Sequence, residues 1–166
     1  MENAVSERSD VWLVWRATLV VALLLYVYPL WVDTPLMDPG EGLHAGIAQE
    51  MVEKGDWVVP RFMGEPFLDK PILYTWAQAV SMRWFGASAA AARAPGLLLA
   101  MLGVVLVGLM GRRLFGDLAG ALAGLFYATM VLPAGLAQTA HHDVAMTPMV
   151  IRAFWALWEG EQARGG

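Results

Sequence analysis

The sequence has no cysteine and few charged side chains. Without cysteine the chain has no disulfide, no thiolate nucleophile and no thiolate metal site. Charged residues make up 16% of its 166 positions, whereas soluble domains carry about a quarter. The net charge is −4 and basic residues nowhere form a stripe, which argues against nucleic acid as a partner. The composition is that of neither a soluble nor a nucleic-acid-binding domain.

Apolar residues are what the chain has in abundance. They make up 58% of the sequence, and the mean hydropathy is +0.51. Eight tryptophans fit a membrane interface, where an amphipathic ring sits at the level of the lipid headgroups. The composition therefore predicts an integral membrane protein that has membrane lipids as partners.

Long uncharged runs predict the membrane-spanning helices, because about 20 apolar residues are needed to cross a bilayer. A further run contains Pro148 and Arg152, and its arginine has to face protein or water rather than lipid. The expected spans are 11–32, 94–111, 118–140 and, as the weaker fourth, 144–158. The expected fold class is thus an all-α integral membrane domain over 1–158, with three to four transmembrane helices and a polar, frayed tail over 159–166.

The short loops predict the orientation. Arg112 and Arg113 lie in the turn between the second and third spans, and Arg8 and Arg16 flank the first span. Positive residues favour the cytoplasmic side, which predicts a cytoplasmic N-terminus in a multi-pass protein of the plasma (inner) membrane. The segments 33–93 and 138–143 are then both on the outer face.

The outer loop 33–93 begins with a predicted helix. Asp38 can cap it, Glu41 falls at its third position as in a capping box, and Gly55 suits its end. Apolar residues at four-residue spacing make this helix amphipathic, so it is expected at the membrane surface. Glu41 and His44 are neighbours on it and could share a proton or a metal ion. The alternative is a helix cap beside a solvated histidine.

A second interfacial helix is expected from about 72 to 85, after Asp69, Lys70 and Pro71. A lysine next to free backbone donors at a helix start can bind phosphate. The alternative is a simple helix cap.

The other outer segment, Thr139 to Asp143, is dense in possible metal ligands. If His141 and His142 are on a helix, their side chains point about 100° apart and do not easily bind one ion. One of them, together with Asp143 and a partner from the first loop, could do so.

Several motifs occur together and in order. They are Glu41 at a helix start, His44-Ala45 with Ala48 and Met51, Gly55 to Pro60, Phe67 to Pro71, Gly111 to Gly116, and Ala137 to Asp143. In this order the chain resembles the N-terminal portion of the GT-C membrane glycosyltransferases. The branch it is most similar to is the aminoarabinose (lipid A) transferase and protein O-mannosyltransferase superfamily.

The resemblance implies an inverting transferase outside the cytoplasm. Its donor is a polyprenyl-phosphate-linked sugar and its acceptor is a lipid or a protein. It implies that Lys70 binds the donor phosphate, that Asp69 helps to hold a divalent metal ion there, and that Asp143 supports the acceptor side. An acid of the first loop, Glu41 or Asp38, would be the general base.

The chain departs from the family pattern in two ways. The column of the family's catalytic aspartate holds Gly40, and the chain has far fewer spans than the dozen or so of the family. The chain is therefore expected to be inactive alone, with a second chain as a potential partner that completes the helix bundle. The alternative is a non-catalytic membrane protein that binds a polyprenyl-phosphate lipid or a partner helix bundle.

Overall fold

A computed structural model describes residues 2–32, 34–37 and 39–164. Apart from one short hairpin, its regular structure is helical, which confirms the all-α membrane class. The elements are α1 Glu2–Trp31, α2 Gly40–Lys54, β1 Arg61–Phe62, β2 Glu65–Pro66, α3 Ile72–Phe85, α4 Ala89–Phe115, α5 Asp117–Thr129, α6 Val131–Ala137, the 3-10 turn η1 His142–Ala145 and α7 Met146–Arg164.

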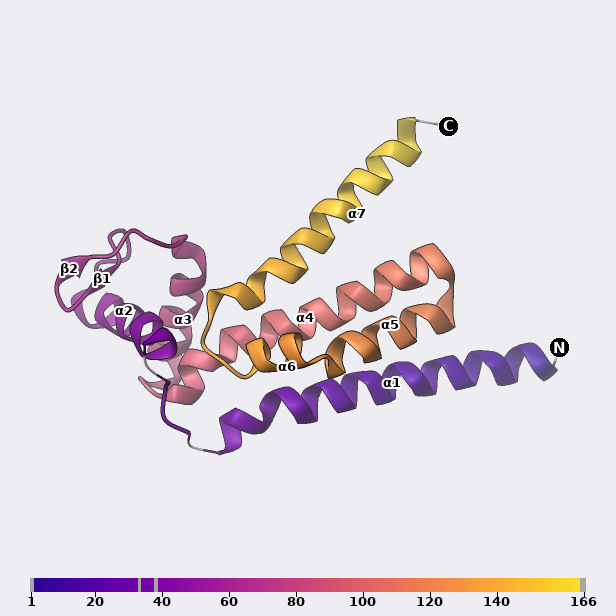
Figure 1. Cartoon of the computed structure of the whole chain (residues 1–166), viewed down its shortest axis with the longest axis horizontal. Helices are drawn as coiled ribbons and strands as arrows, with labels where there is room; N and C mark the ends of the chain where they lie inside the picture. The colour runs from indigo at the N-terminus through magenta and orange to yellow at the C-terminus, as the bar shows by residue number, and fades with distance from the viewer. Residues whose placement is uncertain (1, 33, 38, 165–166) are drawn as a thin grey trace.

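Three long apolar helices, α1, α4 and α5, lie side by side (Figure 1). The N-terminus and the α4–α5 turn are at one end of this bundle, and α2 and α3 are at the other. By length and hydropathy, α1 and α4 can each cross a membrane, and the bent pair α5 and α6 gives a third span if counted as one. The α4–α5 turn and the outer-loop helices α2 and α3 are therefore at opposite ends of the bundle, as the predicted spans require.

Helix α4 begins earlier than its apolar run. It starts at Ala89, where the Ser88 hydroxyl accepts a hydrogen bond from the Ala91 amide at 3.2 Å, a typical N-cap. The helix continues through Pro95, at which the sequence predicts its start. The helix therefore extends beyond the predicted span 94–111 at both ends, and Arg93 lies inside it rather than at the end of the loop.

The predicted third span is broken. Helix α5 ends at Thr129, and α6 leaves it at an angle of 65°. Pro133 explains the break, because it has no amide hydrogen for the Thr129 carbonyl and its ring crowds that turn. The predicted span 118–140 therefore consists of two helices rather than one, and α6 lies toward the end of the bundle at which α2 and α3 lie.

Helix α7 covers the predicted fourth span and most of the predicted tail. It is helical as far as Arg164, so the expectation of a frayed segment fails for 159–164. The helix rises away from the bundle after its first turns (Figure 1), and Pro148 is its buried residue. It is not among the described helices that are apolar enough to span, so a fourth span stays a prediction.

The bundle packs through small residues and two side-chain hydrogen bonds. A methyl group at Gly120 would lie 2.6 Å from the Gly108 carbonyl oxygen on α4, so the two backbones touch. From α1, the hydroxyls of Thr18 and Tyr26 donate to backbone carbonyls of α5 at 3.3 and 3.1 Å. These contacts hold the three helices together without charge.

The two outer-loop helices end where the sequence predicts, but α2 begins at Gly40 with Pro39, rather than the expected Asp38, at its N-cap and without a side-chain capping bond. Gly55 ends α2 with a φ of +70°, and Gly86 ends α3. Helix α2 is not simply laid on a membrane, because one of its faces packs against α3. That face buries Ala45, Ala48 and Met51 together with residues of α3 and α4.

Candidate functional site at the polar end of the bundle

A buried ion pair joins the outer loop to the membrane bundle. Arg93 of α4 donates to both carboxylate oxygens of Glu41, at 2.9 and 2.8 Å. Its remaining donors reach the carbonyls of Thr34 and Pro35 and the Thr34 hydroxyl. Both side chains are almost fully buried, with 4% of the Arg93 side chain and 3% of the Glu41 side chain exposed. An arginine at the start of an apolar helix is thereby completely paired.

The ion pair of Glu41 and Arg93 also holds the second polar segment, residues 138–143, through Ala140. The Ala140 amide donates to Glu41 at 2.7 Å. On the other side, the fully buried Gln78 of α3 donates to the Ala92 carbonyl at 3.1 Å and, at 3.5 Å, to the Ala140 carbonyl. Two segments about a hundred residues apart in sequence are thus fixed to each other, as their shared side of the membrane predicts.

This arrangement disfavours Glu41 as a general base. Burial alone would raise the pKa of Glu41, but the hydrogen bonds from Arg93 and from the Met37 and Ala140 amides outweigh it and hold the pKa below its ordinary value. Every carboxylate oxygen is engaged, so Glu41 has no free lone pair directed at a substrate. The base role of Glu41 stays a prediction, and Asp38, the other proposed base, lies outside the described residues.

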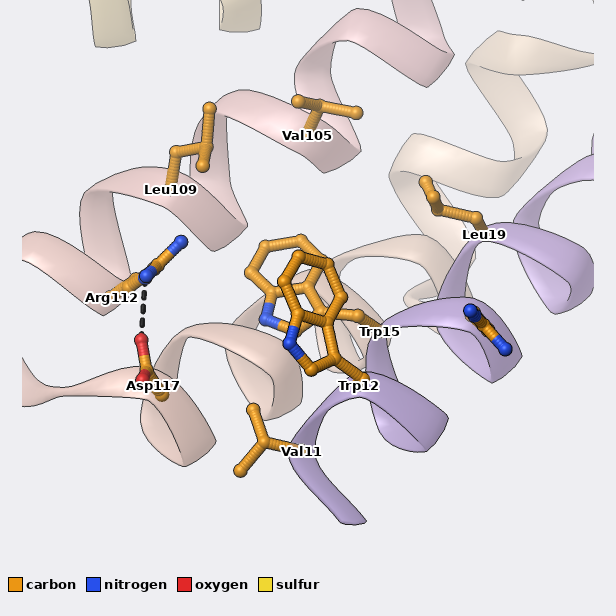
Figure 2. Close-up of a pocket in the computed structure, with 9 residues that line it drawn as sticks. Val11, Trp12, Trp15, Leu19, Val105, Leu109, Arg112 and Asp117 are labelled. Carbon is orange, nitrogen blue, oxygen red and sulfur yellow. Dashed lines mark ion pairs between the residues drawn. The ribbon is translucent and has the colours of Figure 1, made fainter. Parts of the chain in front are cut away.

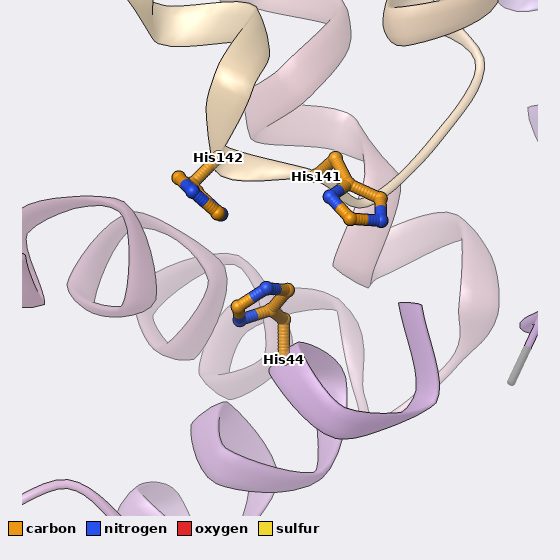
Figure 3. Close-up of side chains that lie close together, drawn as sticks. All are labelled: His44, His141 and His142. Carbon is orange, nitrogen blue, oxygen red and sulfur yellow. The ribbon is translucent and has the colours of Figure 1, made fainter. Parts of the chain in front are cut away.

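All three histidines of the chain meet at this end (Figure 3). His44 projects from α2 toward His141 and His142, with ring centroids 5.6 and 5.0 Å away. Their potential ligand nitrogens lie within 4.8 Å of one another. His141 has an extended backbone and His142 opens the 3-10 turn. The expectation that two adjacent histidines diverge is therefore wrong, because it assumed a helix.

The surroundings favour neutral imidazole at His44. Burial lowers its pKa, and the positive charge that His142, His141 and Lys70 can carry lowers it further, while Asp143 acts in the opposite direction. The Asp143 carboxylate lies 3.1 Å from Nε2 of His142. Nδ1 of His142 is buried and, in the described structure, has no hydrogen-bond partner.

Gly40 makes room for one of these rings. A Cβ atom built at Gly40 would overlap Nε2 of His141 and lie 3.1 Å from its Cε1. Any side chain at position 40 would thus have to displace His141. Gly40, which stands where the family pattern has an aspartate, therefore leaves the space that the His141 ring occupies.

Lys70 and Asp69 lie at the edge of the site, before the first turn of α3. The Lys70 ammonium is 3.7 Å from the Asp69 carboxylate, and their side chains are 41 and 70% exposed. Both are accessible to a ligand. Within the described part of the chain, the one group of three or more potential metal ligands is the histidine cluster. His44 belongs to this cluster and Asp69 does not, so a metal-binding role of Asp69 at the phosphate stays a prediction.

Two hollows lie along the bundle. One, of about 520 Å³, adjoins His141 and Asp143 and is lined mainly by apolar residues of α6, including Val131, Leu132 and Leu136. The other, of about 550 Å³, lies between α1 and the α4–α5 turn (Figure 2). There Trp12 and Trp15 face Leu109 and the Arg112–Asp117 ion pair. Only the first hollow touches the polar site.

Comparison with known proteins gives the family. Residues 69–165 match the family described as dolichyl-phosphate-mannose-protein mannosyltransferase. The chain belongs to this family. The same residues include Lys70, Gln78, Arg93 and the segment with His141 and His142, so most of the site lies within the matched region.

Relatives from bacteria extend the match. The chain is 33% identical over 150 residues to the undecaprenyl phosphate-alpha-4-amino-4-deoxy-L-arabinose arabinosyl transferase of Edwardsiella ictaluri, covering 90% of this chain and 27% of the relative. It is 36% identical to transferase 2 of that name from Pseudomonas fluorescens, covering 84 and 24%. The crystal structure of ArnT from Cupriavidus metallidurans in the apo state is similar, with a TM-score of 0.74, 29% identity, and coverage of 83% of this chain and 25% of that one.

The comparisons confirm the resemblance inferred from the motifs. They also show that the chain spans about a quarter of the length of these relatives. As a member of this family with long apolar helices, the chain is a multi-pass membrane protein.

Sequence reasoning about this family member missed two buried residues of the polar network, Arg93 and Gln78. Arg93 had a signal, because a lone arginine next to an uncharged run needs a buried acidic partner. His141 was expected as a possible metal ligand, but the convergence of His141 and His142 on His44 had no local signal, because it depends on the tertiary hydrogen bonds of Ala140. Asp143 does adjoin His142 and the hollow, as its grouping with the histidines predicts.

Proposed function

We propose that the chain forms the donor-binding part of a membrane glycosyltransferase that takes a sugar from a polyprenyl-phosphate carrier. The observation that carries this proposal is the junction of an apolar hollow with a polar site at the end of the helix bundle. A lipid-linked sugar needs both, since its isoprenoid tail is apolar and its phosphate and sugar are polar. The relatives are named as transferases for such an undecaprenyl-phosphate sugar.

Lys70 is the proposed phosphate ligand. Its ammonium is partly exposed and adjoins the start of α3. As the bond from the sugar to the phosphate breaks, negative charge develops on the phosphate oxygen, and a cation there lowers the barrier. Asp69 is proposed to orient Lys70 or to help hold a divalent metal ion at the phosphate, and Asp143 to support the acceptor side.

Glu41 is proposed to position the site rather than to move a proton. It is buried and bonded to Arg93 and to the Ala140 amide, so it fixes the segment that carries His141 and His142. The acceptor, a lipid or a protein, is then activated by another group, of which Asp143 is the candidate in this chain.

A second candidate function is favoured by Gly40. A transferase that uses an aspartate in this column would have lost its base here, and His141 now fills the space. The chain would then bind a polyprenyl-phosphate lipid, or a partner helix bundle, without catalysis. In both cases we propose an outer-facing site in the inner membrane, a cytoplasmic N-terminus, and a second chain that can complete the bundle.

Binding of undecaprenyl phosphate to the full chain in lipid nanodiscs tests the shared part of both proposals. Lys70→Ala should weaken binding roughly ten- to a hundredfold, as expected for loss of a charged hydrogen bond. The matched control is Lys54→Ala, because Lys54 is an exposed lysine paired with Glu50 at the end of α2. Equal losses in the two variants would refute a phosphate site at Lys70.

Transfer of labelled sugar from an undecaprenyl-phosphate donor separates the two functions. The informative variant is the pair Gly40→Asp and His141→Ala, because the aspartate alone would collide with the imidazole. If the chain is a transferase that lacks its base, the double variant should gain transfer when a completing chain is supplied. If only lipid binding is retained in all variants, the binding function is the correct one.

A further inference from the structure

We propose that His44, His141 and His142 form a binding site for one divalent transition-metal ion. The three rings come from two segments that the polar network holds together, and their ligand nitrogens lie within 4.8 Å of one another. Imidazole is a preferred ligand of zinc, copper and nickel ions. Three histidines are a known ligand set for zinc, which leaves a fourth position for water or for an oxygen of a ligand.

The distances allow the site to close. In a tetrahedral zinc site with bonds of about 2.0 to 2.1 Å, neighbouring nitrogens are about 3.4 Å apart. The rings therefore need to approach by roughly an ångström, which rotation about their side-chain bonds can supply. His44 is on a helix, whereas His141, which follows the anchored residue Ala140, has an extended backbone and His142 opens the 3-10 turn.

One histidine already has the partner that metal ligands commonly have. The Asp143 carboxylate at Nε2 of His142 fixes the ring and its tautomer. That leaves Nδ1, which is buried and has no partner among the described residues, as the nitrogen that binds the ion. A buried, unpaired nitrogen costs free energy in the empty protein, and a bound ion removes that cost.

The charges around the cluster are compatible with a cation. Asp143 contributes a negative charge, and the charges of Glu41 and Arg93 compensate each other. Lys70 opposes the ion, but its ammonium is 41% exposed and can turn to solvent.

Gly40 belongs to this site as well. Only a residue without a side chain leaves the space that the His141 ring occupies. The glycine at position 40 and the position of the His141 ring in the three-histidine cluster are thus coupled. The chain would hold a metal ion at the place where the resemblance implies a carboxylate.

The test is metal binding by the full chain, purified in detergent with a tag that contains no histidine. After treatment with a chelator, isothermal titration with Zn²⁺ should show one equivalent bound. His141→Ala and His142→Ala should each weaken binding at least about tenfold, since each removes one ligand. Gly40→Ala should do the same by displacing His141, and Glu161→Gln, on the exposed face of α7, should have no effect.

Two further readouts keep the proposal falsifiable if a variant folds poorly. With Cu²⁺, electron paramagnetic resonance of the unmodified chain should show coupling to imidazole nitrogens. Asp117→Asn should leave the affinity unchanged, because Asp117 is paired with Arg112 at the opposite end of the bundle and is not in the cluster. Binding without nitrogen coupling, binding lost in Asp117→Asn, or no stoichiometric binding at all would overturn the site. None of these measurements depends on sugar transfer.

Discussion

The apolar bundle and the polar end of this protein are held together in different ways. Helices α1, α4 and α5 touch through small residues such as Gly120 and through isolated hydroxyl–carbonyl hydrogen bonds. The polar end is held by directional bonds that converge on Glu41, Arg93 and Ala140. Packing contacts are many and individually weak, whereas the polar network depends on a few hydrogen-bonding groups, and removal of one leaves its buried partner unpaired. The polar end should therefore be the more sensitive region to single changes.

The largest effect is expected from Arg93→Ala. It leaves the Glu41 carboxylate buried without a partner, which costs about 3 to 5 kcal/mol. The variant should show a lower unfolding temperature. It should also show rapid hydrogen exchange at the Ala140 amide, because this amide donates its hydrogen bond to Glu41. Arg83→Ala, at an exposed arginine of α3, is the control and should change little. A normal Ala140 amide in Arg93→Ala would mean that the ion pair does not hold this segment.

Acid should open the polar end before the bundle. The pKa of Glu41 is lowered from its ordinary value of 4.5 in the folded protein, so its contribution to stability is complete above that pH. As the pH falls below 4.5 toward the lowered value, folding has to release the bound proton, and stability is lost. Hydrogen exchange measured against pH should show this loss at Ala140 first. Glu41→Gln should abolish this pH dependence, and an unchanged profile in that variant would point to another acid.

A smaller effect is expected in the bundle from Gly120→Ala. The added methyl group would lie 2.6 Å from the Gly108 carbonyl oxygen, so α4 and α5 have to separate. Overpacking of this kind costs about 1 to 3 kcal/mol. Gly135→Ala, at a helical glycine with open space around it, is the matched control. Unfolding in detergent mixtures measures both, and equal stability of the two variants would refute close packing at Gly120.

The smallest effect is expected from Ser88→Ala, at the boundary between the two regions. It removes the hydroxyl that accepts from the Ala91 amide at the start of α4, which costs about 1 kcal/mol. Ser88→Asp should restore the cap. Hydrogen exchange over the first turn of α4 measures the change directly. Equal protection in the unmodified chain, Ser88→Ala and Ser88→Asp would show that this cap does not stabilise the helix start.

The sequence predicted α2 and α3 nearly to the residue, because both carry local signals. Gly55 and Gly86 end them, and Pro71 precedes the second. The errors arose where a local signal was absent or was outweighed. Hydropathy could not reveal the early start of α4 at Ala89, and Pro133 broke a run that hydropathy alone treats as one span.

The candidate site also has a part that the sequence predicted and a part that it did not. The alternation of apolar runs and polar segments was enough to predict that Lys70, Glu41 and the histidine segment lie at the same end of the bundle, and motif order indicated the family. The separation of charged from apolar segments determined this much, because a bilayer enforces it along the chain.

Only the tertiary structure decided what these residues do to one another. Glu41 became a buried anchor because Arg93 and the Ala140 amide reach it from two other segments. His141 and His142 converge on His44 because Ala140 is fixed on both sides and Gly40 leaves space. Such contacts depend on distances across the fold, which composition and spacing along the chain do not encode locally.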